Sequence, residues 1–292
     1  MENSEQRTEL DKLRQAIAEA VMQVDYAIKV SRLRDVWMEQ HWTRKREASS
    51  NPLVKRGEKY FSQSDEDGIL LEICRRLGLE RGVFLEIGAG NGLENNSLIL
   101  LMHGWRGAWL GGEPLAFEVP EDGPLFFQQA WITRENCPSL VSHTLSVLGE
   151  RQVDMFSLDL DGNDLYVLEA ALESGLRPQI VIVEYNAKFP PPVRWSVKYD
   201  PQHVWDGTDY QGASLQSFVD LLARFGYRLV ACNLTGGNAF FVQERHAPQF
   251  ADVPQSVAEL FMPPDYCWFV TKGHPVSPRT IEIFLAARAS KA

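Results

Sequence analysis

From residue 60 onward, short continuous apolar runs and longer amphipathic stretches follow one another along the chain. Apolar runs of about four to eight residues between turn residues are typical of buried strands, whereas apolar residues at i, i+3 and i+4 are typical of helices. The runs predict strands at 82–88, 107–113, 125–132, 153–162, 179–186, 227–234 and 238–244. The amphipathic stretches predict helices at 65–79, 94–104, 139–149, 164–175 and 214–226.

This alternation predicts an α/β fold with a Rossmann-like, doubly wound, mostly parallel sheet of seven strands. The last two strands follow each other without a helix, so we expect them to end the sheet as an antiparallel hairpin. In such sheets ligands bind beyond the carboxyl ends of the strands, where the strand order reverses. Acidic and polar residues gather at several of these strand ends, which makes this edge the candidate site.

The N-terminal region has a different pattern, with neither proline nor glycine in residues 5–46. Two apolar sets recur there every seven residues, namely Leu10, Ile17, Val24 and Leu13, Ala20, Ala27. This pattern predicts a long helix that either packs one stripe on its own domain or serves as a dimerisation helix. We therefore expect a helical extension at 1–50, a main domain at 51–245 and a C-terminal extension at 246–292.

The composition is that of a soluble globular protein, with 292 residues, 45% hydrophobic and 23% charged. The net charge of −10 argues against nucleic acid or an anionic membrane as the main partner. No apolar signal-peptide core and no apolar run of about 18 residues occur, so we expect a cytoplasmic protein without a membrane span. The cysteines lie far apart, which favours buried free thiols over a zinc site: Cys74, Cys137, Cys232 and Cys267.

The stretch FLEIGAGNGLENNSLILLMHGWRGAWLGGEP, residues 84–114, joins two expected strands through a glycine loop. Its glycines have the spacing GxGxG, whereas nicotinamide dinucleotide sites have GxGxxG. Glu86, two positions before the first glycine, would repel a pyrophosphate but would suit S-adenosylmethionine, which carries an ammonium group and a sulfonium and no phosphate. Glu113 ends the next strand, where a carboxylate can accept hydrogen bonds from both ribose hydroxyls. The loop therefore favours a nucleoside ligand that is positively charged.

The same stretch resembles the first motif of class I S-adenosylmethionine-dependent methyltransferases. More narrowly, the Asn96-Ser97 pair, the GWRG segment at 104–107 and YFSQSDEDGIL at 60–70 resemble the FkbM-like group. The resemblance covers about residues 58–245. A glycine stands before Glu113 where the group usually has an apolar residue, which loosens the strand end but keeps the acid.

The resemblance implies a set of residues that bind the methyl donor. Its core members are Glu86, Gly88, Gly90 and Glu113, and the further candidates are Gln63, Asn96, Ala130 and Asp159. Trp131 follows Ala130 and is either an adenine contact or a core residue.

Acidic and amide side chains also follow the fourth and fifth expected strands. Asp159 and Asp161 share one strand parity, as do Glu184 and Asn186, so each pair points to one side of the sheet. Carboxylates this close repel one another, and a divalent cation such as Mg²⁺ or Mn²⁺ would compensate them. The resemblance to metal-dependent catechol and sugar O-methyltransferases implies these four residues as candidate ligands. The alternative at 162–164 is a helix-capping turn, which explains Glu184 poorly.

Residues 187–213 form a long irregular segment after the fifth strand, and its five aromatic residues argue against disorder. We interpret it as a lid over the acceptor, because aromatic faces and carboxylates together suit a sugar or polyol. Lys188 and His203 are candidate general bases, and Asp161 is the third candidate catalytic residue.

Together these features predict a methyltransferase that uses S-adenosylmethionine to methylate an oxygen of a sugar, glycan or other polyhydroxylated small molecule, with a divalent metal assisting. Two alternatives stay open at this point. One is a nicotinamide-dependent oxidoreductase, which the GxGxG spacing and Glu86 disfavour. The other is a non-catalytic scaffold that binds a partner through its N-terminal helix.

Overall fold

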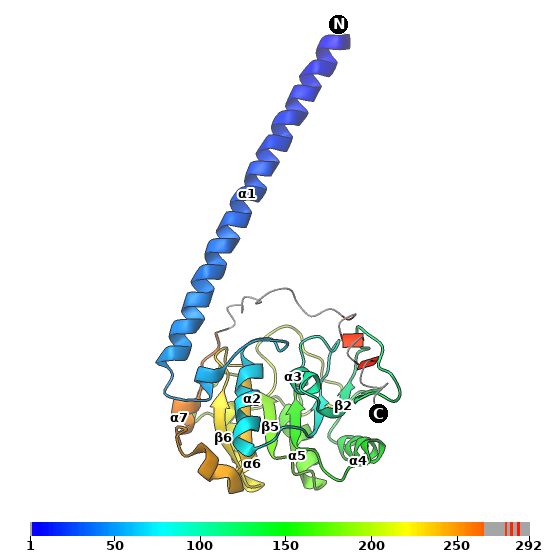
Figure 1. The fold of residues 1–292 in the computed structure, drawn as a ribbon, viewed down its shortest axis with the longest axis vertical. Helices are drawn as coiled ribbons and strands as arrows, with labels where there is room; N and C mark the ends of the chain where they lie inside the picture. Colours follow the sequence, from blue (N-terminus) through cyan, green and yellow to red (C-terminus); the bar gives the residue numbers. More distant parts are fainter. Residues whose placement is uncertain (1, 266–277, 279–280, 283–284, 287–292) are drawn as a thin grey trace. The chain divides into compact units, whose positions relative to one another are not determined.

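The computed structural model describes residues 2–265, 278, 281–282 and 285–286, so Cys267 and much of the C-terminal extension after residue 265 lie outside the described residues. The chain divides into two units, residues 1–44 and 45–292. Figure 1 shows the elements. The helices are α1 (Glu2–Ala48), η1 (Val54–Arg56), α2 (Glu66–Leu77), α3 (Leu98–Met102), α4 (Cys137–Leu148), α5 (Asp164–Glu173), α6 (Leu215–Arg224), η2 (Glu244–Phe250) and α7 (Val257–Leu260). The strands are β1 (Val83–Ile87), β2 (Arg106–Gly111), β3 (Leu125–Gln129), β4 (Met155–Leu158), β5 (Ile180–Glu184), β6 (Tyr227–Cys232) and β7 (Asn238–Gln243).

The second unit is built on a seven-stranded sheet with the order β3-β2-β1-β4-β5-β7-β6. Strands β1 to β5 pair in parallel, and β7 pairs antiparallel with β5 and with β6. The predicted doubly wound sheet with a terminal antiparallel hairpin is therefore confirmed. The strand order reverses between β1 and β4, so right-handed crossovers place α3 and α5 on opposite faces of the sheet. This reversal is where the fold leaves room for a ligand.

The central strands β1 and β4 are buried along their whole length, which is why their sequences are almost continuously apolar. Helices α4, α5 and α6 are neighbours in one layer against the sheet. Two helices end at left-handed glycines, α2 at Gly78 and α4 at Gly149. Asp65 precedes α2, but its carboxylate accepts a hydrogen bond from the backbone N–H of Leu234 instead of capping the helix. Cys74, Cys137 and Cys232 are buried free thiols, as predicted.

The first unit is the N-terminal part of α1, so the predicted long helix is confirmed. Its large apolar side chains are exposed, among them Leu10, Ile17 and Val24. In the part of the chain that the structure describes, no helix combines the length and the apolar character needed to cross a bilayer.

Candidate functional site

The loops after β1, β2 and β3 are joined by main-chain hydrogen bonds at the carboxyl edge of the sheet. The N–H groups of Gly88 and Ala89 donate to the carbonyl oxygen of Leu110 over 2.8 and 3.2 Å. The N–H of Ala130 donates to the carbonyl oxygen of Gly111 over 2.8 Å. Gly88, Gly90, Glu113 and Ala130, all predicted to bind a donor, therefore come from three loops that form one continuous edge.

Glycine is found at two positions of the loop, Gly88 and Gly90, for different structural reasons. Gly88 has a φ of 94°, and a Cβ there would lie 1.5 Å from the carbonyl oxygen of Asp159, so only glycine allows the end of β4 to approach this closely. Gly90 has a φ of 50°, is exposed, and would have no atom within 4 Å of a Cβ. The open side of the loop is thus at Gly90, while Gly88 joins the loop to the residue that begins the second predicted cluster.

Glu86 is buried, and its carboxylate fixes the start of α3. It accepts hydrogen bonds from the backbone N–H groups of Asn96 (3.0 Å) and Ser97 (2.9 Å) and from the Ser97 hydroxyl. The indole N–H of Trp109 donates to the same hydroxyl over 2.7 Å. Burial raises the pKa of Glu86, and the hydrogen bonds from Ser97 and Asn96 oppose that rise. Glu86 therefore shapes the glycine loop through its hydrogen bonds to Asn96 and Ser97, the two residues before α3.

The other predicted donor contacts differ in exposure, and Asn96 is buried. Glu113 and Gln63 are exposed, and Ala130 is partly exposed. The amide of Asn96 donates to the Ser157 hydroxyl over 3.2 Å, so its side chain links α3 to β4. Trp131 is 54% exposed, which excludes the interpretation of this residue as core.

Asp159, Asp161 and Glu184 form a cluster that we call the acidic trio, because one carboxylate oxygen from each lies within 4.8 Å of the others. Burial and then the neighbouring negative charges raise the pKa of Asp159 and of Glu184 well above their ordinary values. Burial also raises the pKa of Asp161, and the nearby His203 opposes that rise. The trio is held in a strained turn, since Asp161 has a φ of 55°. Carboxylates in this state either retain a proton or bind a cation.

The turn itself is stabilised by Asp164, whose carboxylate accepts the N–H groups of Leu160 (2.7 Å) and Gly162 (2.9 Å). Burial raises the pKa of Asp164 to about 6. A turn at 162–164 is therefore present beside the acidic trio, but no side chain of it caps α5 with a hydrogen bond.

The irregular segment after β5 is fixed to this turn. Asn163 donates to the carbonyl of Asp200 (2.7 Å) and accepts from its N–H (3.3 Å), and the indole of Trp131 donates to the carbonyl of Pro201 over 2.8 Å. The ring of His203 packs on Gly162, where a Cβ would lie 2.1 Å from its Cδ2. Within the described residues, Nε2 of His203 is buried without a hydrogen-bond partner. The segment therefore positions, next to the acidic trio, an imidazole nitrogen that has no hydrogen-bond partner among the described residues.

Gln211 is a residue of this site that the sequence did not reveal. With its amide oriented to satisfy its neighbours, its nitrogen donates to Oε2 of Glu184 and to Oδ1 of Asp161, each over 3.3 Å. No spacing or motif distinguishes this glutamine, because its partners lie 27 and 50 positions earlier in the chain.

The two remaining predicted residues bind the segment rather than the acidic trio. The amide of Asn186 donates to the carbonyls of Asp209 (2.8 Å) and Gln211 (3.0 Å), and its oxygen accepts from the N–H of Lys188. Nζ of Lys188 forms an exposed ion pair with Asp209 over 3.0 Å.

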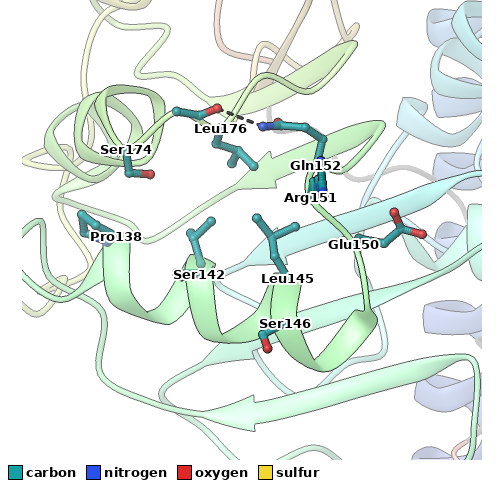
Figure 2. A pocket seen from close by; sticks show the side chains of 11 residues that line it. Pro138, Ser142, Leu145, Ser146, Glu150, Arg151, Gln152, Ser174 and Leu176 are labelled. Carbon is teal, nitrogen blue, oxygen red and sulfur yellow. Dashed lines mark hydrogen bonds between the residues drawn. The ribbon is translucent and has the colours of Figure 1, made fainter.

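Two hollows lie elsewhere, at the amino edge of the sheet. The first, of about 350 Å³, lies between α4 and the turn after α5 and is shown in Figure 2. The second, of about 540 Å³, has Gln152 in common with the first and is lined by Asp154 and Arg177, among others. Both are lined by residues that come just before β4 and β5 in the chain, so they lie at the end of the sheet opposite the acidic trio.

Comparison with known proteins gives distant likenesses. No family model matches the chain, and no curated protein matches it. The MycE methyltransferase of the mycinamycin pathway, solved with Mg, SAH and mycinamycin VI, matches with 14% identity and a TM-score of 0.39 over 60% of this chain and 48% of MycE. The chain thus spans about half the length of that structure.

Two further structures cover most of their own chains. The N-terminal domain of EvdMO1 with SAH bound matches with 14% identity and a TM-score of 0.38, over 70% of this chain and 94% of that domain. The glycopeptide N-methyltransferase MtfA with SAH matches with 16% identity and a TM-score of 0.37, over 65% and 95%. Likenesses this distant do not assign an activity, which must come from the chemistry of the residues.

Proposed function

We propose that this protein is an S-adenosylmethionine-dependent methyltransferase that methylates a hydroxyl of a sugar, glycan or other polyhydroxylated small molecule, assisted by Mg²⁺ or Mn²⁺. The observation that carries the proposal is the contact between Gly88 and the carbonyl of Asp159. It makes the glycine loop and the acidic trio two sides of one edge, so a donor on one side and an acceptor on the other would meet across it.

On the donor side, Gly90 leaves the backbone open and Glu113 is an exposed carboxylate that can accept two hydroxyls. Bound S-adenosylmethionine supplies a methyl group on a positively charged sulfur.

On the acceptor side, the oxygen ligands of the acidic trio fit a hard divalent cation, and Gln211 can offer a fourth oxygen by rotating its amide. The exposed aromatic side chains of Trp205 and Tyr210 suit the apolar faces of a sugar. We assign Nε2 of His203, which is buried without a hydrogen-bond partner among the described residues, as the base that accepts the proton an acceptor hydroxyl loses. Lys188, paired with Asp209, is the second candidate base.

Titration calorimetry tests the donor side with S-adenosylhomocysteine and with NAD. We expect the wild type to bind S-adenosylhomocysteine and not NAD, and Glu113→Ala to weaken that binding about tenfold or more, since it loses a charge-assisted contact. Glu118→Ala is the matched control, because Glu118 is exposed on the same β2–β3 connection. Equal binding by Glu113→Ala and the wild type would refute the assigned donor pocket.

Titration with Mn²⁺, followed by electron paramagnetic resonance, tests the metal separately. We expect one bound ion per chain in the wild type and none in Asp161→Asn. The acceptor class is tested by transfer of a labelled methyl group to a panel of methyl glycosides and primary amines, with His203→Ala as the base variant. Labelling of the amines alone would overturn the assignment to oxygen.

A further inference from the structure

The apolar side chains of the N-terminal unit form a stripe that spans five turns of α1. Its members follow one another at intervals of three or four residues and are between 47% and 62% exposed: Leu10, Leu13, Ile17, Val21, Val24 and Ile28. On a helix of 3.6 residues per turn they fall within an arc of about 80°. We call these six residues the first stripe.

The helix carries opposite charges in its two halves. Residues 2–25 hold six acidic and three basic residues, whereas residues 26–44 hold four basic and two acidic residues. The first stripe begins in the acidic half and reaches into the basic half. Two helices that pair in parallel would place like charges side by side. An antiparallel pair centred on residue 19 places residues 2–12, with four acidic and two basic residues, beside residues 26–36, with three basic residues and one acidic residue.

A second apolar set lies on the opposite face of the helix: Met22, Tyr26, Val30, Leu33 and Trp37. It lies almost wholly in the basic half, so pairing this set with itself would bring basic segments together. Charge therefore selects the first stripe as the self-complementary one.

We propose that two copies of this chain associate through their N-terminal helices as an antiparallel pair, with the first stripe of each copy covering that of the other. The pair is symmetric about residue 19, so Leu10 of one copy lies beside Ile28 of the other, and Arg14 of one lies near Asp25 of the other. The residues involved are independent of the proposed methyl-transfer site, so this inference does not rest on the proposed function.

Sedimentation equilibrium of the full chain tests the association. We expect a dimer that weakens at about 1 M salt, where charge pairs are screened. Val24→Asp should raise the dissociation constant about tenfold or more, because it places a charge in the seam. Met22→Asp is the matched control, since it adds the same charge two residues away on the opposite face and should leave the constant unchanged. A monomeric wild type, or dissociation by Met22→Asp alone, would overturn the proposal.

Cysteine cross-linking tests the orientation, because residues 10 and 28 are about 27 Å apart along a helix. Under oxidising conditions, a mixture of Leu10→Cys and Ile28→Cys chains should form a mixed disulfide, and neither variant alone should form one. Disulfides within each single variant would show parallel helices and refute the proposed arrangement. Circular dichroism of each variant at 222 nm checks that the helix is retained.

Discussion

The two edges of the sheet differ in how well their polar groups are compensated. At the amino edge, Asp154 accepts the N–H of Val83 (2.9 Å) and the amide of Gln179 (2.8 Å), and Gln152 donates to the carbonyl of Gly175 (3.0 Å). At the carboxyl edge, the acidic trio has raised pKa values and His203 has a buried nitrogen without a partner among the described residues. The two hollows described above lie at the amino edge, whereas the acidic trio and His203 lie at the carboxyl edge.

This contrast shows that a hollow is weaker evidence for a site than a set of polar atoms that lack hydrogen-bond partners or compensating charges. In the hollow of Figure 2, the side chain of Gln152 donates its hydrogen bond to the carbonyl of Gly175, within the protein itself. Buried polar groups without partners lower the stability of the fold, so we expect to find them where a ligand supplies the missing partner. Each of the following substitutions compares one edge with the other or tests the carboxyl edge directly.

The largest expected effect compares two left-handed glycines, one at each edge. Gly88→Ala would place a Cβ 1.5 Å from the Asp159 carbonyl and should lower the free energy of unfolding by about 3–5 kcal/mol. Gly175→Ala, at a φ of 101° with nothing within 4 Å, should cost only about 1 kcal/mol. Urea unfolding measures both. Equal losses would show that backbone conformation alone, and not the contact with β4, determines the cost.

The next effect is the dependence of stability on pH. Burial raises the pKa of Asp65 to about 7 and that of Asp67 to about 6, from an ordinary value near 4. The folded state therefore holds these protons more tightly than the unfolded state, so their stabilising contribution is full below about pH 4 and is lost as the pH rises through 6 to 7. In the absence of divalent ions, the free energy of unfolding should fall by about 2 kcal/mol or more from pH 5 to pH 8.

Asp65→Asn is the variant that identifies the source of this slope. It keeps an acceptor for the Leu234 N–H but cannot ionise, so it should flatten the profile between pH 5 and pH 8. An unchanged slope would show that other groups govern the pH dependence.

A third comparison expects opposite signs at the two edges. Without a cation, Glu184→Gln should raise the free energy of unfolding by about 1 kcal/mol, because it removes a negative charge from the acidic trio. Asp154→Asn should lower it by about 1–2 kcal/mol, because the new amide cannot accept from both of its donors. Glu184→Gln should also weaken Mn²⁺ binding about tenfold or more. A destabilised Glu184→Gln would contradict the view that the trio is under electrostatic strain.

The smallest expected effect compares two glutamines. Gln152→Ala removes bonds to Gly175 and Arg177 at the amino edge and should cost about 1 kcal/mol of stability, with Mn²⁺ binding unchanged. Gln211→Ala should change stability little and weaken Mn²⁺ binding a few-fold, since its partners are the carboxylates of the trio. Calorimetry measures Mn²⁺ binding by the two variants, and thermal unfolding measures their stability. Weaker Mn²⁺ binding by Gln152→Ala than by Gln211→Ala would exclude Gln211 from the site.

The sequence predicted the strands of the sheet well, because buried strands need apolar residues. It predicted the helices between them because the ends of helices favour particular residue types. It also predicted that Asp159, Asp161 and Glu184 meet, since the carboxyl ends of neighbouring parallel strands lie at one edge. It could not predict contacts that only the tertiary structure creates. The partners of Glu86 lie just before α3, and those of Gln211 lie at the end of β5 and in the turn after β4. The close approach of Gly88 to Asp159 depends on how far β4 extends beside β1.

The Gly88–Asp159 contact also bears on the order in which ligands arrive. A ligand that moves the glycine loop by a few tenths of an ångström must move the carbonyl of Asp159 with it, because no free space separates them. If the proposed donor and acceptor bind on the two sides of this contact, each should change the affinity for the other. Thermodynamic linkage makes the two changes equal, whichever ligand binds first, although a single peptide group joins the two sides.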